Sequence, residues 1–356
     1  MNYPKTQGIK YTGSKLKILP YIIDIISKLN IKTVWDGFSG TTRVSQALSQ
    51  LGYKIYASDI AEWSYVFGCC YLLNKENREH YIDLINHLNN VKPIDGFISK
   101  YYGGEITDHK KPFQLKNTRK IDGIRQEIDK LKLNNQDKCV ALTSLILAMD
   151  KVDSTLGHYS SYLNEWSERS YNDIRLEIPQ LYINKEKNEV YQDDIFNLTD
   201  KIKADLSYFD PPYGSNNEKM PASRVRYNSY YHIYKTIILN DNPEIFGKCN
   251  RRKDSSDKLI DNPFESFRKD KETGNYIAFE TIKRLIKETK SKYILLSYSN
   301  NGKVKLKDIK DILSDNGKII FISEIDYKKN IMAQLSWTGE WVNDKNNKEM
   351  LFLLEK

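Results

Sequence analysis

Residues 33–60 constrain the fold more than any other part of the sequence, because a strand, a glycine turn, a helix and a second strand follow one another closely there. A short apolar strand at 33–36 runs into a turn at 36–40, a helical pattern covers 41–51, and 54–60 has the pattern of a second strand. Two parallel strands must be joined by a crossover, which is usually a helix. The unit therefore predicts an α/β protein with a mostly parallel sheet.

The rest of the chain extends this pattern. Apolar residues recur at helical spacing over 16–29. Further strands are predicted at 188–195, 204–210 and 292–299, further helices at 277–289 and 304–313, and two closing strands at 318–325 and 349–356. The long polar segment between the closing strands favours an antiparallel pair at one edge of the sheet.

Residues 62–187 differ in character from the sequence on either side. Helical patterns dominate there, at 76–89, 119–133 and 137–150. We therefore expect two units: a sheet domain formed by 1–61 and 188–356, and a mainly helical region inserted at 62–187.

Composition excludes several classes of protein. Of the 356 residues, 40% are hydrophobic and 29% are charged, which is typical of a globular protein. No apolar run approaches the ~18 residues of a membrane span, and the N-terminus has no apolar signal-peptide core, so we expect no membrane association and a cytoplasmic location. The four cysteines lack metal-ligand spacing, so no metal site is predicted. The formal net charge of +8 permits a polyanionic partner.

The sharpest chemical signal is Asp210-Pro211-Pro212-Tyr213, which directly follows a predicted strand. Two prolines cannot continue a parallel strand, so they make a rigid turn at its carboxyl end, where open α/β sheets bind ligands. The turn combines an Asp carboxylate, the free carbonyl of Pro211 and an aromatic ring. A nucleobase with an exocyclic amine fits this set, because the two oxygens accept N–H groups and the ring stacks on the base. The competing interpretation is a structural turn with a core tyrosine.

Other strand ends also carry carboxylates. The turn Asp36–Gly40 lets a ligand approach the backbone closely, but it lacks the G-x-G-x-x-G spacing of a pyrophosphate site. Asp59, followed by Ile60, stands where dinucleotide folds bind a ribose hydroxyl pair; a helix N-cap is the alternative. Asp193-Asp194-Ile195 follows a third strand, and a carboxylate beside apolar side chains there suits either an adenine amine or a solvated turn.

Together these motifs resemble those of the DNA adenine methyltransferases that use S-adenosylmethionine, in the group with the cofactor motifs first and D-P-P-Y late. Lys10–Lys15 (KYTGSK) is similar to that family's opening cofactor motif, and Asp36–Gly40 is similar to its F-x-G-x-G motif, with Thr42 in place of the last glycine. Asp210–Tyr213 matches the catalytic motif. Two downstream segments are also similar to family segments, Asn228–Tyr234 and Leu296–Gly302. The resemblance implies a Rossmann-like methyltransferase fold, with 62–187 as a helical DNA target-recognition region.

The resemblance also implies roles for single residues. The cofactor-binding residues would be Tyr11 at the adenine or methionine end, Lys15 beside the carboxylate, Phe38 and Gly40 around the methionine part, Asp59 at the ribose hydroxyls, and Asp193 or Asp194 with Ile195 at the adenine. Asp36 and Ile60 would belong to the same cofactor site. The choice between the two neighbouring aspartates stays open. The catalytic residues would be Asp210, Pro211, Pro212 and Tyr213, which hold and stack on an adenine flipped out of the duplex.

The predicted function is site-specific methylation of adenine in double-stranded DNA, as the modification half of a bacterial restriction–modification system. Any cognate endonuclease would be a separate chain. The alternatives are an rRNA or cytosine amino-methyltransferase and a catalytically silent DNA-binding module. A serine in place of Asp210 would point to cytosine, and the intact Asp210–Tyr213 and Asp59 argue against the silent module. Basic residues also crowd 214–275, which is consistent either with phosphate contacts or with a solvated loop: Arg224, Arg226, Arg251, Arg252, Lys253, Arg268 and Lys269.

Overall fold

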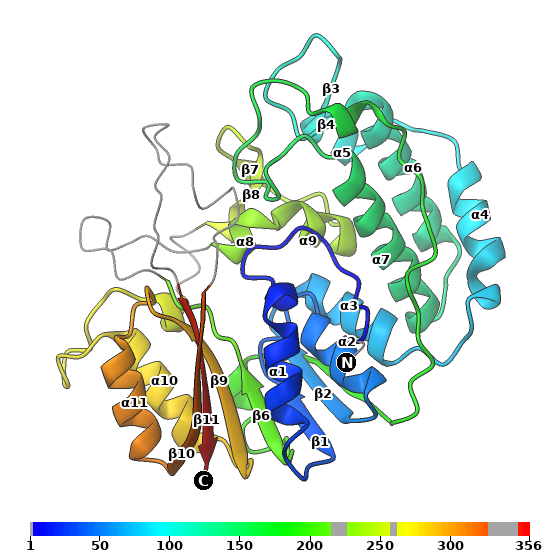
Figure 1. Ribbon diagram of the computed structural model, residues 1–356. Coiled ribbons are helices and arrows are strands. Elements are labelled where there is room, and N and C mark those ends of the chain that lie inside the picture. The colour runs from blue at the N-terminus through cyan, green and yellow to red at the C-terminus, as the bar shows by residue number, and fades with distance from the viewer. Residues whose placement is uncertain (1–2, 215–225, 257–261, 327–347) are drawn as a thin grey trace.

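A seven-stranded sheet forms the centre of the computed structural model, which describes residues 3–214, 226–256, 262–326 and 348–356 (Figure 1). The strand order is β10-β11-β9-β6-β1-β2-β5. The strands are β1 (Thr33–Asp36), β2 (Lys54–Asp59), β5 (Glu189–Gln192), β6 (Leu206–Phe209), β9 (Tyr293–Ser299), β10 (Lys318–Asp326) and β11 (Lys348–Glu355). All neighbours pair in parallel except β11, which is antiparallel to both β9 and β10. The predicted α/β fold with an antiparallel edge pair is confirmed.

Helices cover both faces of this sheet (Figure 1). Apolar side chains of α1 (Leu19–Ile26) and α2 (Arg43–Gln50) share a buried cluster with Val34 of β1. Those of α10 (Ile277–Glu288) and α11 (Leu306–Ser314) share another with Trp35, the next residue along the same strand. Successive side chains of a strand point to opposite faces, so the unbroken apolar run of β1 requires cover on both sides.

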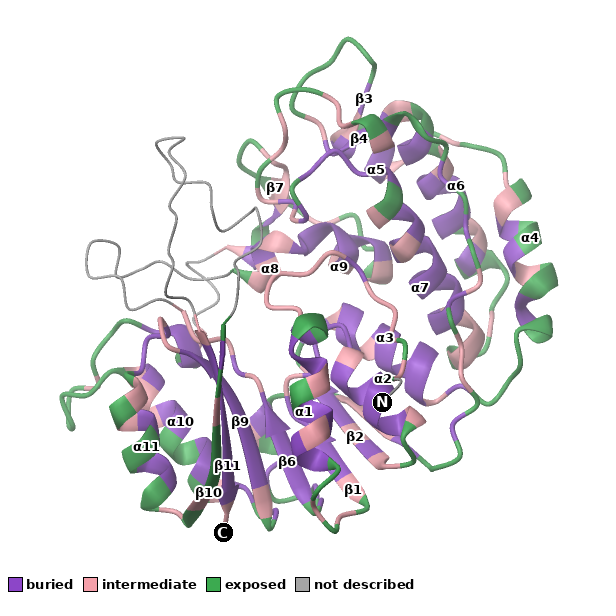
Figure 2. Cartoon of the chain, viewed as in Figure 1, coloured by how far each residue is buried: buried purple, intermediate pink, exposed green. Residues whose placement is uncertain are grey.

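A helical lobe stands above the carboxyl ends of the parallel strands (Figure 1). It contains α4 (Ile82–Asn90), α5 (Phe97–Tyr102), α6 (Leu115–Lys130) and α7 (Asn135–Val152), with the short pairs β3 (Gly103–Gly104) with β4 (Phe113–Gln114) and β7 (Ile245–Phe246) with β8 (Arg251–Arg252). Figure 2 shows α7 buried along most of its length, as the central helix of this lobe. The lobe also includes a later segment, α8 (Tyr227–Tyr230) and α9 (His232–Leu239). Arg125 of α6 links α9 to the rest of the lobe, because its Nε donates a hydrogen bond to the carbonyl of Ile237 at 2.5 Å.

Helix α3 (Glu62–Leu72) connects the lobe to the sheet and is absent from the sequence-based prediction. It contacts β2 and β5 on one side and α7 on the other. Because both sides are buried, the helix is apolar almost all round and shows no amphipathic period. Helix α9 is also absent from the sequence-based prediction, because it lies within the mostly polar segment 214–275. Its apolar residues are buried only by packing against the lobe. No helix in the described ranges is long and apolar enough to cross a membrane.

The contact between α3 and β5 depends on Gly68. A Cβ built on this residue would lie 2.6 Å from a methyl carbon of Val190. We predict that Gly68→Ala destabilises the protein by about 1–2 kcal/mol, because overpacking outweighs the better helix propensity of alanine. Urea unfolding measures the change. In the Gly68→Ala/Val190→Ala double variant, part of the loss should be recovered; a Gly68→Ala single variant as stable as wild type would contradict the packing argument.

Candidate active site at the carboxyl ends of β1, β2 and β6

A cavity opens where β2 and β6 flank β1 at their carboxyl ends. In open α/β sheets this switch in strand order is the usual ligand site. The predicted site residues that line the cavity are Tyr11, Lys15, Asp36, Phe38, Gly40, Asp59, Ile60, Asp193, Asp194, Ile195, Asp210 and Pro212. Pro211 and Tyr213 lie just outside this lining. Tyr213 packs edge-on against Tyr298, with 5.6 Å between ring centroids, and the Lys15 ammonium lies 5.5 Å from the Tyr213 ring.

The turn after β1 requires its glycines. A Cβ on Gly37 would lie 2.6 Å from the ring of Phe209 and 2.8 Å from Ile195. Gly40 has a φ of +49° and lies against the ring of Tyr11. Thr42 also lies in the left-handed region, with a φ of 58°, and this is the position where the resembling family has a glycine. The threonine hydroxyl donates to the carbonyl of Thr41 at 2.7 Å, so local hydrogen bonding accompanies the unfavourable backbone geometry.

Asp59 closes this turn from the end of β2. Its Oδ2 accepts the N–H of Gly40 at 2.9 Å, and its Oδ1 accepts the N–H of Ala61 at 3.0 Å. Burial raises the pKa of Asp59, and these backbone donors oppose the rise. Each carboxylate oxygen has a second lone pair, so the group can still accept hydroxyl donors from the cavity.

Asp36 is the most deeply buried carboxylate of the cavity, at 1% exposure. Its Oδ2 accepts the hydroxyl of Ser45 at 2.6 Å, whereas its Oδ1 accepts no hydrogen bond from the described part of the chain. Burial raises the pKa of Asp36 to about 7, against the effect of the Ser45 hydrogen bond. A buried acceptor without a donor costs free energy unless a ligand supplies one.

The far end of the cavity combines a carboxylate pair with aromatic rings. Asp193 Oδ1 accepts both the Asp194 N–H and the Asn197 side-chain amide, each at 2.8 Å. Asp194 caps a short helix through its Oδ1, which accepts the N–H of Phe196 at 2.9 Å. Phe264 stands beside them, stacked parallel to Phe196 and edge-on to Phe38. A planar apolar ligand with an amine at one edge fits this end of the cavity.

Asp210 shares one cation with another acid. Its Oδ1 lies 2.8 Å from Lys15 Nζ, which also lies 3.2 Å from Oε1 of Glu349 on β11. Burial raises the pKa of Asp210 to about 7, Lys15 opposes the rise and Glu349 adds to it. Burial lowers the pKa of Lys15, but the two carboxylates outweigh it and hold that pKa well above its usual value. Lys15, which was predicted to lie beside a cofactor carboxylate, pairs with Asp210 and Glu349 in this structure.

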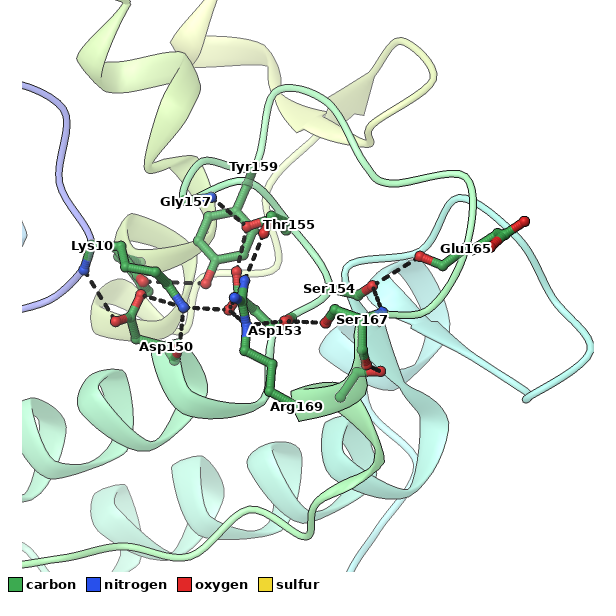
Figure 3. A network of polar contacts seen from close by, with 12 residues as sticks. Lys10, Asp150, Asp153, Ser154, Thr155, Gly157, Tyr159, Glu165, Ser167 and Arg169 are labelled. Atoms are coloured by element: carbon green, nitrogen blue, oxygen red, sulfur yellow. Dashed lines mark hydrogen bonds and ion pairs between the residues drawn. The ribbon is translucent and has the colours of Figure 1, made fainter. Parts of the chain in front are cut away.

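A polar network holds the N-terminal segment in place (Figure 3). The backbone N–H of Lys10 donates to Asp150 Oδ2 at 3.1 Å, and its ammonium donates to Asp153 Oδ1 at 2.7 Å. Arg169 Nε donates to the Asp153 carbonyl at 2.7 Å. Tyr11, the next residue after Lys10, stacks on Tyr231, between α8 and α9, with 4.6 Å between ring centroids. The lobe therefore positions the opening motif over the sheet.

Several site residues escaped the sequence analysis. Tyr208 lines the cavity, and its hydroxyl has no hydrogen-bond partner among the described residues. Tyr208 precedes Asp210 by two residues, and residues at this spacing lie on the same face of an extended chain. The spacing could therefore have predicted that Tyr208 faces the site. Phe264 and Glu349 lie far from the motifs in sequence, and no local pattern marks them.

Arg252, one of the basic residues considered for phosphate binding, and His232 both make their polar contacts inside the protein. Arg252 is buried and forms a bidentate pair with Asp241, both contacts at 2.7 Å, so it is not exposed for phosphate binding. Burial lowers the pKa of His232 to about 3, and its Nε2 lies 3.1 Å from the Tyr159 carbonyl. Arg224 lies outside the described residues. No group of three or more potential metal ligands occurs within the described ranges.

The strand order and the cavity at its switch point define a Rossmann-like α/β protein. The model of one family, the D12 class N6 adenine-specific DNA methyltransferases, matches residues 11–320. The chain belongs to this family. The sequence-based predictions of the family, of S-adenosylmethionine as its cofactor and of adenine methylation as its chemistry are confirmed at this level.

Similar proteins are named as modification enzymes. The modification methylase StsI of Streptococcus sanguinis is 27% identical, over 98% of this chain and 52% of its own length. The type II methyltransferase M.NlaIII of Neisseria lactamica is 25% identical, over 98% of this chain and 99% of its own. M2.HphI of Haemophilus parahaemolyticus is 26% identical, over 100% and 99%. The chain thus spans about half of StsI and nearly all of the other two.

Asp36 Oδ1, which has no hydrogen-bond partner in the described part of the chain, should affect the free energy of unfolding. We predict that Asp36→Asn stabilises the protein by about 1–3 kcal/mol near pH 8, since the variant cannot carry a buried charge. The folded-state pKa of Asp36 lies above its unfolded value, so the wild-type penalty is absent below about pH 4 and grows until about pH 7. The gain should therefore shrink as the pH falls through this window. Urea unfolding at several pH values measures it.

Asp205→Asn is the matched control, and its expected effect on stability is opposite to that of Asp36→Asn. Asp205 accepts the backbone N–H groups of Lys32 at 2.8 Å and Thr33 at 2.9 Å, and its pKa is lowered by these bonds in spite of partial burial. Asp205→Asn should therefore destabilise the protein at neutral pH. Equal effects of the two substitutions would contradict the assignment of Asp36 as an unsatisfied buried acid.

Proposed function

We propose that this protein is a site-specific DNA methyltransferase of a restriction–modification system, which transfers a methyl group from S-adenosylmethionine to the 6-amino group of adenine in double-stranded DNA. The observation that carries the proposal is the position of Asp210. It lies in the same cavity as Asp36 and Asp59, so a carboxylate suited to a nucleobase amine faces a site suited to the methyl donor.

The cavity fits this donor group by group. The free Oδ1 of Asp36, together with the Tyr208 hydroxyl, would accept from the ammonium of the methionine part. Asp59 would accept from the ribose hydroxyls. Asp194 would take the adenine amine, because its Oδ2 has no partner among the described residues while Asp193 is held by Asn197. The rings of Phe38 and Phe264 would flank the base.

The chemistry requires orientation more than acid–base work. The bound donor supplies a methyl group already activated on a sulfonium. The adenine amine is a weak nucleophile because its lone pair is delocalised into the ring. Asp210 and the Pro211 carbonyl would accept its two N–H groups and so favour a tetrahedral, attack-ready nitrogen. Transfer would form the N–CH3 bond as the S–CH3 bond breaks, with the electron pair of that bond going to sulfur and one N–H proton leaving to solvent.

The target base has to leave the duplex to reach Asp210. Tyr213 stands directly after the proline turn and would stack on the flipped adenine. The region 62–187 would read the target sequence in the duplex. The similarity to type II modification enzymes supports a role in protecting host DNA, with a separate endonuclease chain as partner and the bacterial cytoplasm as the location.

Single-molecule sequencing of DNA from cells that express the protein tests this function. We expect one sequence motif to be marked at adenine throughout the genome. Absence of any DNA mark from a folded, cofactor-binding protein would refute the proposal, and methyl transfer to rRNA would then identify the alternative substrate.

Removing the catalytic carboxylate should stop transfer. We predict that Asp210→Ala lowers kcat on the order of a thousand-fold or more, because the amine loses its acceptor. Cofactor affinity should stay within about three-fold of wild type, since Asp210 serves the target base. Tritiated methyl transfer and equilibrium dialysis measure the two quantities. Near wild-type turnover in the variant would show that the catalytic assignment is wrong.

The stacking role of Tyr213 has a separate test. We predict that Tyr213→Ala lowers kcat/KM for duplex DNA about ten- to a hundred-fold, as expected for the loss of one base–aromatic contact. Tyr213→Phe keeps the ring and should stay within about three-fold of wild type. Steady-state kinetics on a DNA duplex with the marked motif compares them. Equal losses in both variants would assign the effect to the hydroxyl instead of the ring.

A further inference from the structure

Glu349 is a buried carboxylate for which the reaction above has no use. Its side chain is 3% exposed, and its Oε1 lies 3.2 Å from the Lys15 ammonium. The same oxygen accepts the hydroxyl of Ser297 on β9 at 2.6 Å. A buried carboxylate is costly unless it is paired, so the place of Glu349 on β11 depends on Lys15.

The charges of this cluster do not balance. Lys15 lies within 3.2 Å of two carboxylates, those of Asp210 and Glu349. With all three groups ionised the cluster carries a net charge of −1. If Glu349 were neutral, Lys15 and Asp210 would form an isolated pair with no net charge.

The net charge matters for methyl transfer because positive charge moves from the sulfonium to the adenine nitrogen during the reaction. A fixed negative charge beside that nitrogen stabilises the transition state, most strongly in a site that excludes water. Lys15 alone would weaken this effect by neutralising Asp210. Glu349 shares the ammonium, which lies 3.2 Å from its Oε1, and so offsets that neutralisation.

We propose that Glu349 is a positioning residue of the transfer reaction: it shares the Lys15 ammonium with Asp210, so that the ionised Asp210 is not fully neutralised by Lys15 when it accepts the target amine. This inference rests on the function proposed above. It assigns a role to a strand at the far end of the chain from the cofactor motifs.

Other titratable groups also face Asp210. They are Asp36 on β1, Tyr208 on β6, Tyr227 on α8 and Tyr11 on the N-terminal segment, and Tyr213 on the proline turn faces the Lys15 ammonium. Burial raises the pKa of Tyr11, Tyr208 and Tyr227 well above its ordinary value, so these three stay neutral near pH 7. Lys15 is the cation paired with Asp210 among the described residues.

The test is Glu349→Gln, which keeps the shape and removes the charge. We expect kcat to fall about ten-fold while KM for S-adenosylmethionine stays within about three-fold of wild type. Asp210 must be ionised to accept the amine, so activity falls at acid pH. Because Glu349 raises the pKa of Asp210, its loss should move this acid limb to lower pH, by about one unit.

Glu355→Gln is the matched control, the same substitution on the same strand. Glu355 pairs with Lys292 at the other end of β11, and this variant should keep the wild-type kcat and acid limb. A purely structural role for Glu349 would lower kcat or stability without moving the acid limb, and that result would overturn the proposal. Wild-type kinetics in Glu349→Gln would overturn it as well.

Glu349→Asp decides the matter if the Gln variant does not fold. Its shorter carboxylate should hold Lys15 less well, so we expect a shift of the acid limb in the same direction but of smaller size. A folded Asp variant with the wild-type limb and kcat would refute the proposal. The same assay tests the proposed function separately. If the wild-type protein transfers no methyl group to DNA, the proposed function is wrong, whatever the Glu349 variants do.

Discussion

Burial of charge at the carboxyl end of β6 is the constraint on which this site depends. Lys15, Asp210 and Glu349 come from the start, the middle and the end of the chain, and none of them is stable there without the others. The N-terminal segment, the proline turn and the last strand must therefore assemble together. The antiparallel position of β11 next to β9 is what brings Glu349 and its partner Ser297 to this edge.

Helix α3 and the N-terminal segment join the lobe to the sheet. Helix α3 is buried against β5 at Gly68 and against α7, and Tyr11 stacks on Tyr231, just before α9. The network around Asp153 ties Lys10 to the end of α7 (Figure 3). The opening motif thus lies between the unit that would hold the cofactor and the unit that would read DNA.

The fold was largely predictable from local patterns. The central strands were placed to within a few residues because apolar runs ended by glycine or proline have few other solutions. Helix α3 was missed because burial on both sides removes the periodicity that marks an amphipathic helix. Arg252 illustrates the same limit for polar residues, since its burial and its pair with Asp241 depend on the tertiary structure.

The sequence by itself determined the chemistry that this protein presents: carboxylates at the ends of β1, β2, β5 and β6, and the proline turn that follows Asp210. Local chain stiffness and strand ends place these groups, so neighbouring residues suffice to predict them. Only the tertiary structure decided how the groups are paired. Lys15 faces Asp210 and Glu349, one oxygen of Asp36 has no donor among the described residues, and Phe264 lines the cavity beside Phe38. Such pairings join residues hundreds of positions apart, and they depend on packing and desolvation that no local pattern encodes.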